Sequence, residues 1–286
     1  MSRVTVEMGD GSARGQKTRA LIVTVYGLYA REAGGWMSVA SVIQLLAECG
    51  VDGSAVRSSI YRLKRRGLLV ALNVDGVAGY GLSDGARVIL DQGDRRIFDR
   101  RRASAAEGWL LAVFSVPESE RDKRHQLRSR LAWLGFGNVA AGVWIAPAQL
   151  LDEAREIITL HGLDGYVDLF RADHLAFADT AGRVPAWWDL DHLRDLYATF
   201  LDRYGPVLEG YRRREVIDSA QAFTDYVSAL TEWRQLPYLE PGLPAEMLPA
   251  DWIGIRAADT FFELHNLLAE PAHRFANSVR HPIRTS

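Results

Sequence analysis

The sequence predicts an α+β protein with an N-terminal winged helix-turn-helix, a central ferredoxin-like domain and a C-terminal helical domain. Three observations lead to this prediction. Two helix patterns and a hairpin pattern follow one another within residues 38–83. Strand and helix patterns then follow in the order β-α-β-β-α-β over residues 107–175. Residues 176–286 are mostly helical in pattern.

The N-terminal domain is expected over residues 17–83, after a flexible tail at residues 1–16. The apolar run 20–30 is expected to be a buried helix, although its β-branched residues leave a strand open as the alternative. Ser38 is placed to cap a helix that continues to Glu48. A second helix, residues 54–66, then leads into a hairpin with a tight turn at Asp75-Gly76.

The second of these helices predicts a contact with DNA. Val56, Ile60 and Leu63 recur at helical spacing and would face the core. A winged helix-turn-helix places such a helix in the major groove, where Arg57 could bond guanine O6 and N7 together. Small serines would permit close approach, and the remaining cations and the tyrosine suit phosphate. The predicted DNA-binding residues are Ser54, Arg57, Ser58, Tyr61, Arg62, Lys64 and Arg65.

Two alternatives stay open for this region. The cations could form an ordinary solvated helix face, or the winged helix could contact a protein. The hairpin tip carries no Lys or Arg, so we expect it to contribute little to DNA binding.

The distribution of charge supports a DNA-binding front. Residues 1–103 carry sixteen Lys and Arg against ten Asp and Glu, whereas the remainder carries eighteen against twenty-six. A basic segment joined to an acidic body is typical of a DNA-binding domain with a regulatory domain attached. This asymmetry does not distinguish DNA from RNA.

Residues 84–106 are expected to form a linker helix between domains. Its cations, Arg95, Arg96 and the cluster Arg100–Arg102, could contact phosphate or face solvent. The single cysteine, Cys49, excludes an internal disulfide, suits a reducing cytoplasm and is expected to pack rather than react. No apolar run approaches the ~20 residues needed to span a bilayer, so no membrane partner is expected.

The central domain, residues 107–175, is expected to dimerise. Its strands are predicted at 109–116, 138–141, 143–146 and 166–170, and its helices at 118–133 and 148–161. A dimer would double the DNA contacts of one winged helix and would require a palindromic operator.

The C-terminal domain, residues 176–286, combines aromatic and cationic residues around a Pro-rich connector at 237–249. Helices are predicted at 187–203, 215–236 and 259–269. Aromatic walls with a few cations suit a ligand bearing an acyl group and phosphates. The alternative is an ordinary helical core with a solvated run of Arg. The candidate ligand residues are Trp187, Trp188, Arg212, Arg213, Arg214, Trp233 and Arg234.

Several stretches resemble one known family. They are residues 55–63, 114–118, 134–137, 142–147, 230–239 and 241–244, in the family's order. On these the chain resembles the PaaX family of bacterial transcriptional repressors, the regulators of phenylacetic acid breakdown. The resemblance implies a Cas2-like central domain used for dimerisation. It also implies release of DNA by an acyl- or aryl-CoA thioester such as phenylacetyl-CoA, which nothing in composition or spacing shows.

A Cas2-like central domain raises a metal-dependent nuclease as the rival function. Such a nuclease needs an acidic residue at the end of its first strand, but residues 114–117 read Phe-Ser-Val-Pro. The chain has no phosphate loop, nucleophile elbow or CxxC, and its seven His residues lack ligand spacing. We therefore expect no catalytic residue, no metal and no cofactor. The expected partners are double-stranded operator DNA, a second copy of the chain and a CoA-thioester inducer.

Overall fold

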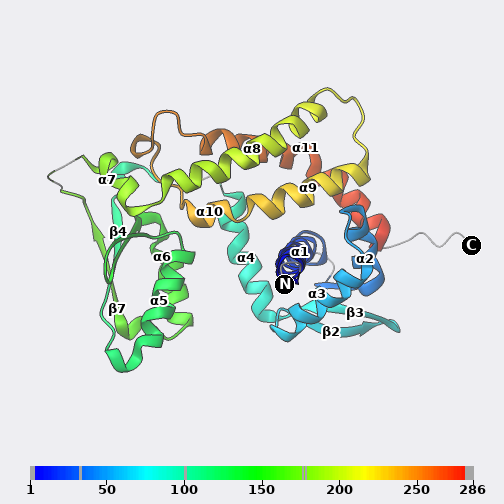
Figure 1. Ribbon diagram of the computed structural model, residues 1–286, viewed down its shortest axis with the longest axis horizontal. Helices are drawn as coiled ribbons and strands as arrows, with labels where there is room; N and C mark the ends of the chain where they lie inside the picture. Colours follow the sequence, from blue (N-terminus) through cyan, green and yellow to red (C-terminus); the bar gives the residue numbers. More distant parts are fainter. Residues whose placement is uncertain (1–3, 32–33, 100–101, 176, 178, 281–286) are drawn as a thin grey trace, which may run out of the picture. The chain divides into compact units, whose positions relative to one another are not determined.

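In the computed structural model the chain forms two compact units (Figure 1). Unit 1 holds the residues up to Arg95 together with Asp202–Trp233 and the residues from Ala258 onward. Unit 2 holds Arg96–Leu201 and Arg234–Ala257. The structure describes the chain over residues 4–31, 34–99, 102–175, 177 and 179–280, with side chains in the first helix from residue 14 onward.

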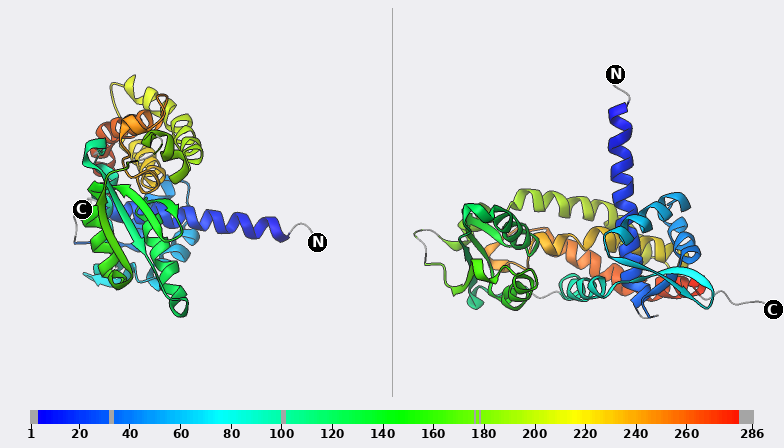
Figure 2. Two further views of the ribbon diagram at one scale, coloured as in Figure 1. Left: turned by 90° about the vertical axis from the view of Figure 1, so that its left-hand side faces the viewer. Right: turned by 90° about the horizontal axis from the view of Figure 1, so that it is seen from below.

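Unit 1 begins with a helix where a flexible tail was expected. Helix α1 spans Val4–Val25 and continues as a π-helical turn over Tyr26–Ala30, so the apolar run 20–30 is helical as predicted. Figure 2 shows the first turns of α1 extending away from the other elements of unit 1. The tail prediction for residues 1–16 is therefore wrong from Val4 onward, because the helix continues through the polar residues that precede the apolar run.

The next elements follow the expected order of helix, helix and hairpin. They are β1 (Trp36–Ser38), α2 (Val39–Glu48), α3 (Gly53–Arg65), β2 (Leu69–Val74) and β3 (Val77–Leu82). The strands form an antiparallel sheet in the order β1-β3-β2, in which β1 was not predicted.

Local chemistry explains two of these boundaries. The Ser38 hydroxyl accepts a hydrogen bond from the Ser41 amide at 3.0 Å and caps α2 as predicted. Asp75 and Gly76 both have positive φ, 51° and 80°, which is the backbone of the predicted two-residue hairpin turn. At the other end of α2, burial raises the pKa of Cys49 to about 12, which favours the expected packing role.

Helices from the C-terminal third complete the core of unit 1. Helix α9 (Ser219–Trp233) packs against α1 and α2, and the Thr231 hydroxyl donates to the Thr24 hydroxyl at 2.8 Å. The Tyr29 and Phe223 rings lie 5.6 Å apart between their centroids. Figure 1, in which α1 is seen end-on, shows α3 and α9 on opposite sides of α1. The compact units and the expected domains thus divide the chain differently.

Unit 2 contains the expected β-α-β-β-α-β order. The elements are β4 (Trp109–Phe114), α5 (Arg121–Trp133), β5 (Gly137–Ala140), β6 (Val143–Pro147), α6 (Leu151–Leu160) and β7 (Val167–Ala172). The strands lie in the order β5-β6-β4-β7 and all neighbours are antiparallel, which is the ferredoxin-like arrangement. Leu127 and Leu131 of α5 and Ile157 of α6 bury one face of this sheet.

Of the remaining helices, two were not predicted and three differ from the prediction in their ends. They are α4 (Asp84–Phe98), α7 (Thr180–Trp187), α8 (Leu190–Arg212), α10 (Leu236–Leu239) and α11 (Gly254–Arg280), with short 3-10 turns at Ala105–Glu107, Glu118–Glu120, Ala148–Leu150, Asp164–Tyr166 and Ala245–Met247. The helix expected from Trp187 to about Arg203 is α8, which starts only at Leu190, because Trp188 is extended and the Asp189 carboxylate accepts a capping hydrogen bond from the His192 amide at 3.0 Å. Helix α9 starts at Ser219 rather than at 215, because the Asp218 carboxylate accepts from the Gln221 amide at 2.8 Å.

Candidate nucleic-acid interface

Helix α3 begins at a carboxylate cap. The Asp52 carboxylate accepts hydrogen bonds from the amides of Ser54 and Ala55, at 2.9 and 3.0 Å, and from the Ser54 hydroxyl at 2.6 Å. The bond from the Ser54 hydroxyl is the largest of the causes that lower the pKa of Asp52. Ser54, predicted to approach DNA, is therefore engaged in the cap, and an acidic side chain lies at the tip of the helix.

The two faces of α3 are separated as predicted. Val56, Ile60 and Leu63 are buried, and Ser59, which the sequence did not single out, is buried with them. All the predicted DNA-binding residues are exposed, and Tyr61 is 60% exposed. The buried face packs against α1 and α2, which leaves the polar face turned outward.

Four cations lie on the exposed face of α3. Arg57, Arg62, Lys64 and Arg65 have no hydrogen-bonding or acidic partner among the residues that the structure describes. Arginines of the C-terminal helices behave differently, since Arg203 and Arg212 are paired with carboxylates. A row of unpaired cations on one exposed helix face attracts a polyanion.

The neighbouring hairpin is exposed and apolar. Val70, Leu72, Val74 and Val77 are each at least 40% exposed. The hairpin therefore supplies contact area rather than charge beside α3.

Two cations of the linker region are structural. The Arg96 guanidinium donates to the Leu134 carbonyl at 2.8 Å, pairs with Glu153 at 3.2 Å and lies 5.0 Å from the Tyr238 ring. Burial lowers the pKa of Arg96 despite these partners. Arg102 is also paired, whereas Arg100 and Arg101 lie outside the described residues.

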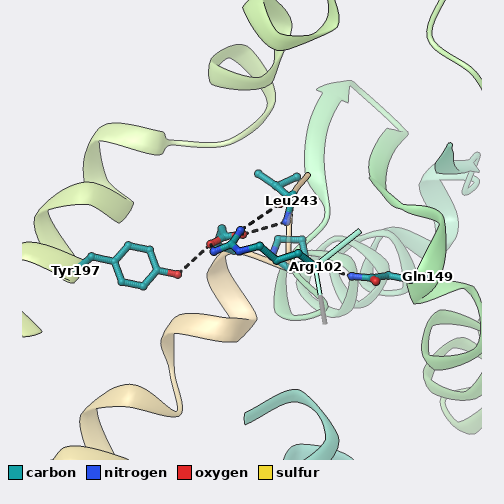
Figure 3. Close-up of polar contacts among 6 residues, drawn as sticks. Arg102, Gln149, Tyr197 and Leu243 are labelled. Atoms are coloured by element: carbon teal, nitrogen blue, oxygen red, sulfur yellow. Dashed lines mark hydrogen bonds and ion pairs between the residues drawn. The ribbon is translucent and has the colours of Figure 1, made fainter. Parts of the chain in front are cut away.

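The partner of Arg102 is a buried carboxylate that sequence reasoning missed. Glu240 is 4% exposed and accepts two hydrogen bonds from Arg102, at 3.0 and 3.1 Å, and one from the Leu243 amide at 2.9 Å (Figure 3). The Tyr197 hydroxyl donates to the same carboxylate at 3.2 Å. A Glu inside an apolar, Pro-rich connector was the available signal, since such a charge is buried only when paired.

The candidate ligand residues of unit 2 are largely buried. Trp187 and Trp188 pack against Trp109, with ring centroids 5.8 and 6.1 Å from it. The Trp188 indole donates to the Gly135 carbonyl at 2.9 Å. Burial lowers the pKa of Arg234, whose side chain is partly buried. These residues fill the interior of unit 2.

The other candidates belong to unit 1. Trp233 is buried and stacks on Phe261 at 4.9 Å, and Arg212 binds Glu263. Arg214 lies 4.7 Å from the Tyr211 ring centroid and Arg213 is exposed. The candidates are thus distributed over two units, and their role in ligand binding stays a prediction.

A shallow groove runs along α5 in unit 2. Arg121, Arg124, His125, Arg128 and Trp144 are among the residues that line it, and none of the candidate ligand residues does so. Within the described ranges, no group of three or more His, Cys, Asp or Glu side chains could hold a metal ion. In the same part of the chain, no helix has the length and apolarity to cross a membrane.

An exposed cationic helix followed by a hairpin is typical of DNA-binding domains. Family models identify which kind. The model for PaaX-like proteins matches residues 17–86, that for the central Cas2-like domain of PaaX proteins residues 102–184, and that for the PaaX-like C-terminal domain residues 188–278. The chain belongs to the PaaX family of transcriptional regulators.

The chain is also similar to one curated protein and to one solved structure. The chain is 24% identical over 262 residues to the transcriptional repressor PaaX of Escherichia coli K12, which covers 90% of this chain and 82% of the relative. It also resembles the solved structure of the uncharacterized protein Rv0674 from Mycobacterium tuberculosis, with a TM-score of 0.54 and 22% identity. That match covers 89% of this chain and 100% of the other and shows the fold alone.

The buried Glu240 carboxylate should contribute to the free energy of unfolding. Glu240→Ala should lower the free energy of unfolding by about 3–5 kcal/mol, because it removes the carboxylate that partners both the half-buried Arg102 guanidinium and the buried Tyr197 hydroxyl. Denaturant titration followed by circular dichroism measures this change. Glu118→Ala breaks an exposed pair with Arg124 and should have little effect. An equal loss in both variants would contradict the structural importance of Glu240.

The charge of the Asp52 carboxylate should affect the affinity of the protein for duplex DNA. Asp52→Asn retains a good capping side chain but removes a negative charge from the tip of α3. We expect it to bind duplex DNA about 2–5-fold more tightly than the wild type at low salt, because phosphate repulsion is lost. Asp52→Ala, which removes the cap as well, should gain less. Weaker DNA binding by Asp52→Asn, measured by fluorescence anisotropy, would show that the carboxylate does not face the phosphates.

Proposed function

We propose that the chain is a repressor that inserts α3 into the major groove of operator DNA as the recognition helix of a winged helix-turn-helix. The observation that carries this proposal is the exposed face of α3, on which four cations lack partners among the described residues. In the proposed complex Arg57 reads base edges, while Arg62, Lys64 and Arg65 hold phosphates on the flanks. The exposed hairpin β2–β3 takes the position of the wing.

The nuclease alternative has less support. Strand β4 ends at Phe114, and the residues that follow, Ser115, Val116 and Pro117, carry no carboxylate for a metal ion. Cleavage of phosphodiesters by metal ions requires clustered oxygen ligands at this position. The relative identified by sequence is named as a transcriptional repressor, which favours regulation over hydrolysis.

Two substitutions test the DNA contact. Arg57→Ala should cost about 1–3 kcal/mol of binding free energy per half-site on specific DNA and little on random DNA, because a base contact is lost. Lys64→Ala should weaken binding to all sequences alike and reduce the salt slope by about 1, because a phosphate contact is lost. Gel shifts on a selected duplex and on random DNA measure both effects. If Arg57→Ala weakens specific and random binding equally, the base contact is wrong.

We also propose that the protein forms a homodimer through the ferredoxin-like domain. Helices α5 and α6 cover one face of its sheet, while the other face carries Val113 and Phe170, which are 37% and 51% exposed. Exposed apolar residues on a sheet face suit contact with another protein. A dimer would present two α3 helices to a palindromic operator.

Sedimentation tests the dimer. We expect the wild type to sediment as a dimer at micromolar concentration and Phe170→Glu to shift it to the monomer, because a charge would be buried at the interface. Val216→Glu, at a site 82% exposed in unit 1, is the control and should remain dimeric. A wild-type monomer that binds operator as one copy would contradict this part of the proposal.

We further propose that an acyl- or aryl-CoA thioester such as phenylacetyl-CoA releases the protein from DNA. The family resemblance supports this ligand class, and the C-terminal region is the proposed place of binding. To release DNA, the ligand must bind the DNA-free conformation more tightly than the DNA-bound one. The same coupling then makes operator DNA weaken the binding of the ligand.

Calorimetry tests the effector. Phenylacetyl-CoA should bind the free protein about 5–150-fold more tightly than the operator-bound protein, which corresponds to a coupling of about 1–3 kcal/mol. Arg234→Ala should weaken this binding if the C-terminal candidates hold the ligand. Equal affinity with and without operator would refute release by this ligand.

A further inference from the structure

Helix α1 contributes cations beside the predicted recognition helix. Residues 14–19 of α1 contain Arg14, Lys17 and Arg19 and no acidic residue. This helix packs directly on α3, and its Gly15 lies beside the side chain of Arg62, which belongs to the exposed face described above. The sequence alone predicts DNA-binding side chains on α3 and leaves a phosphate contact open for the linker cations, but it predicts none on α1.

Two arginine side chains converge on one backbone position of α1. A Cβ atom built on Gly15 would lie 3.3 Å from Nη1 of Arg62 and 3.5 Å from Nη1 of Arg19. One guanidinium comes from α3 and the other from α1, and both reach the space that a side chain at residue 15 would fill. Neither has an acidic or hydrogen-bonding partner among the described residues. We call Gly15, Arg19 and Arg62 the α1–α3 notch.

Without a bound anion, the residues of the notch are expected to destabilise this part of the contact between α1 and α3. Two like charges in proximity repel each other. A glycine within a helix also costs up to about 1 kcal/mol relative to alanine. An anion bound between the two guanidinium groups would offset the repulsion, and the absence of a Cβ leaves it room. Arginine pairs are well suited to oxygen atoms of phosphate, because each guanidinium can donate two parallel hydrogen bonds.

We propose that the α1–α3 notch binds a single backbone phosphate of duplex DNA. The proposal rests on the proposed function in that α3 lies in the major groove. Phosphates at the edges of the groove then flank the helix, where they fix its register without reading sequence. Arg62 approaches the phosphate from α3 and Arg19 from α1, so the two helices hold one anion together.

If Arg19 and Arg62 hold the same phosphate, their substitutions should not have independent effects on DNA binding. Binding of the full-length protein to a selected duplex would be followed by fluorescence anisotropy across a series of salt concentrations. Arg19→Gln and Arg62→Gln should each weaken binding about 5–20-fold and reduce the salt slope by about 1. The double variant should lose clearly less than the product of the two single losses, because the second substitution removes a contact already broken.

Lys17→Gln is the matched control, since it removes the same charge from the same helix. The Lys17 ammonium does not line the notch and lies close enough to Cys49, at the end of α2, to oppose the rise that burial causes in the pKa of that thiol, so its removal should change affinity about twofold or less. Gly15→Ala is a second variant that should not unfold the protein, since it favours the helix. Its Cβ should weaken DNA binding several-fold while leaving the melting temperature unchanged or higher.

The possible outcomes separate this proposal from the proposed function. If the wild type binds no duplex, the proposed function fails and the notch proposal fails with it. If the wild type binds but Arg19→Gln and Gly15→Ala bind equally well, the notch is wrong while the proposed function stands. Losses that multiply in the double variant would indicate two separate contacts and contradict a shared phosphate. Stabilisation by inorganic phosphate that Arg19→Gln abolishes, with unchanged duplex affinity, would identify a small-anion site and also overturn the proposal.

Discussion

The packing of α1 against both α3 and α9 is the constraint on which unit 1 depends. Leu21, Ile22 and Val25 of α1 are fully or almost fully buried, and the Thr24 hydroxyl is bonded to Thr231 of α9. A buried hydroxyl must keep its hydrogen bond or incur a cost of about 1–3 kcal/mol. The position of α3 is therefore tied, through α1, to a helix of the C-terminal third.

The C-terminal helices are connected to the elements around α3 by two further direct hydrogen bonds, which bears on the proposed regulation of DNA binding. The Thr224 hydroxyl donates to the Glu48 carbonyl, and the Arg280 guanidinium donates to the Tyr29 carbonyl. A rearrangement of α9 or α11 would have to break these bonds or move the elements around α3 with them. The proposed effector, if bound at α9 or α11, would therefore reach α3 through contacts within unit 1.

In unit 2 the family motifs have a common physical explanation. Gly135 has a φ of +80°, and a Cβ there would lie 2.9 Å from the Tyr238 carbonyl oxygen. A Cβ on Gly137 would lie 2.9 Å from the Trp188 ring. The connector that supplies Tyr238 also supplies Glu240. Stretches that are far apart in sequence therefore share one tightly packed region, in which each requires the others.

The sequence predicted those parts of the fold that local pattern determines. The cap at Ser38, the turn at Asp75-Gly76, the ferredoxin-like order and the polar face of α3 follow from spacing and turn chemistry alone. What could not be predicted depends on contacts between distant residues. The Thr24–Thr231 and Arg102–Glu240 pairs, and the placement of Trp233 in the core of unit 1, leave no periodic signal in the sequence. Strand β1 was missed because three residues are too short for a pattern.

Site-directed cross-linking tests the central claim, that the exposed face of α3 lies against the bases. A photoactivatable group would be attached at Ser58→Cys, and for comparison at Leu160→Cys on α6, in a Cys49→Ala background. Leu160 is 64% exposed and lies in unit 2. The account predicts cross-links from residue 58 to bases within each half-site of a selected duplex, and none from residue 160. Cross-links from residue 160 alone would contradict it.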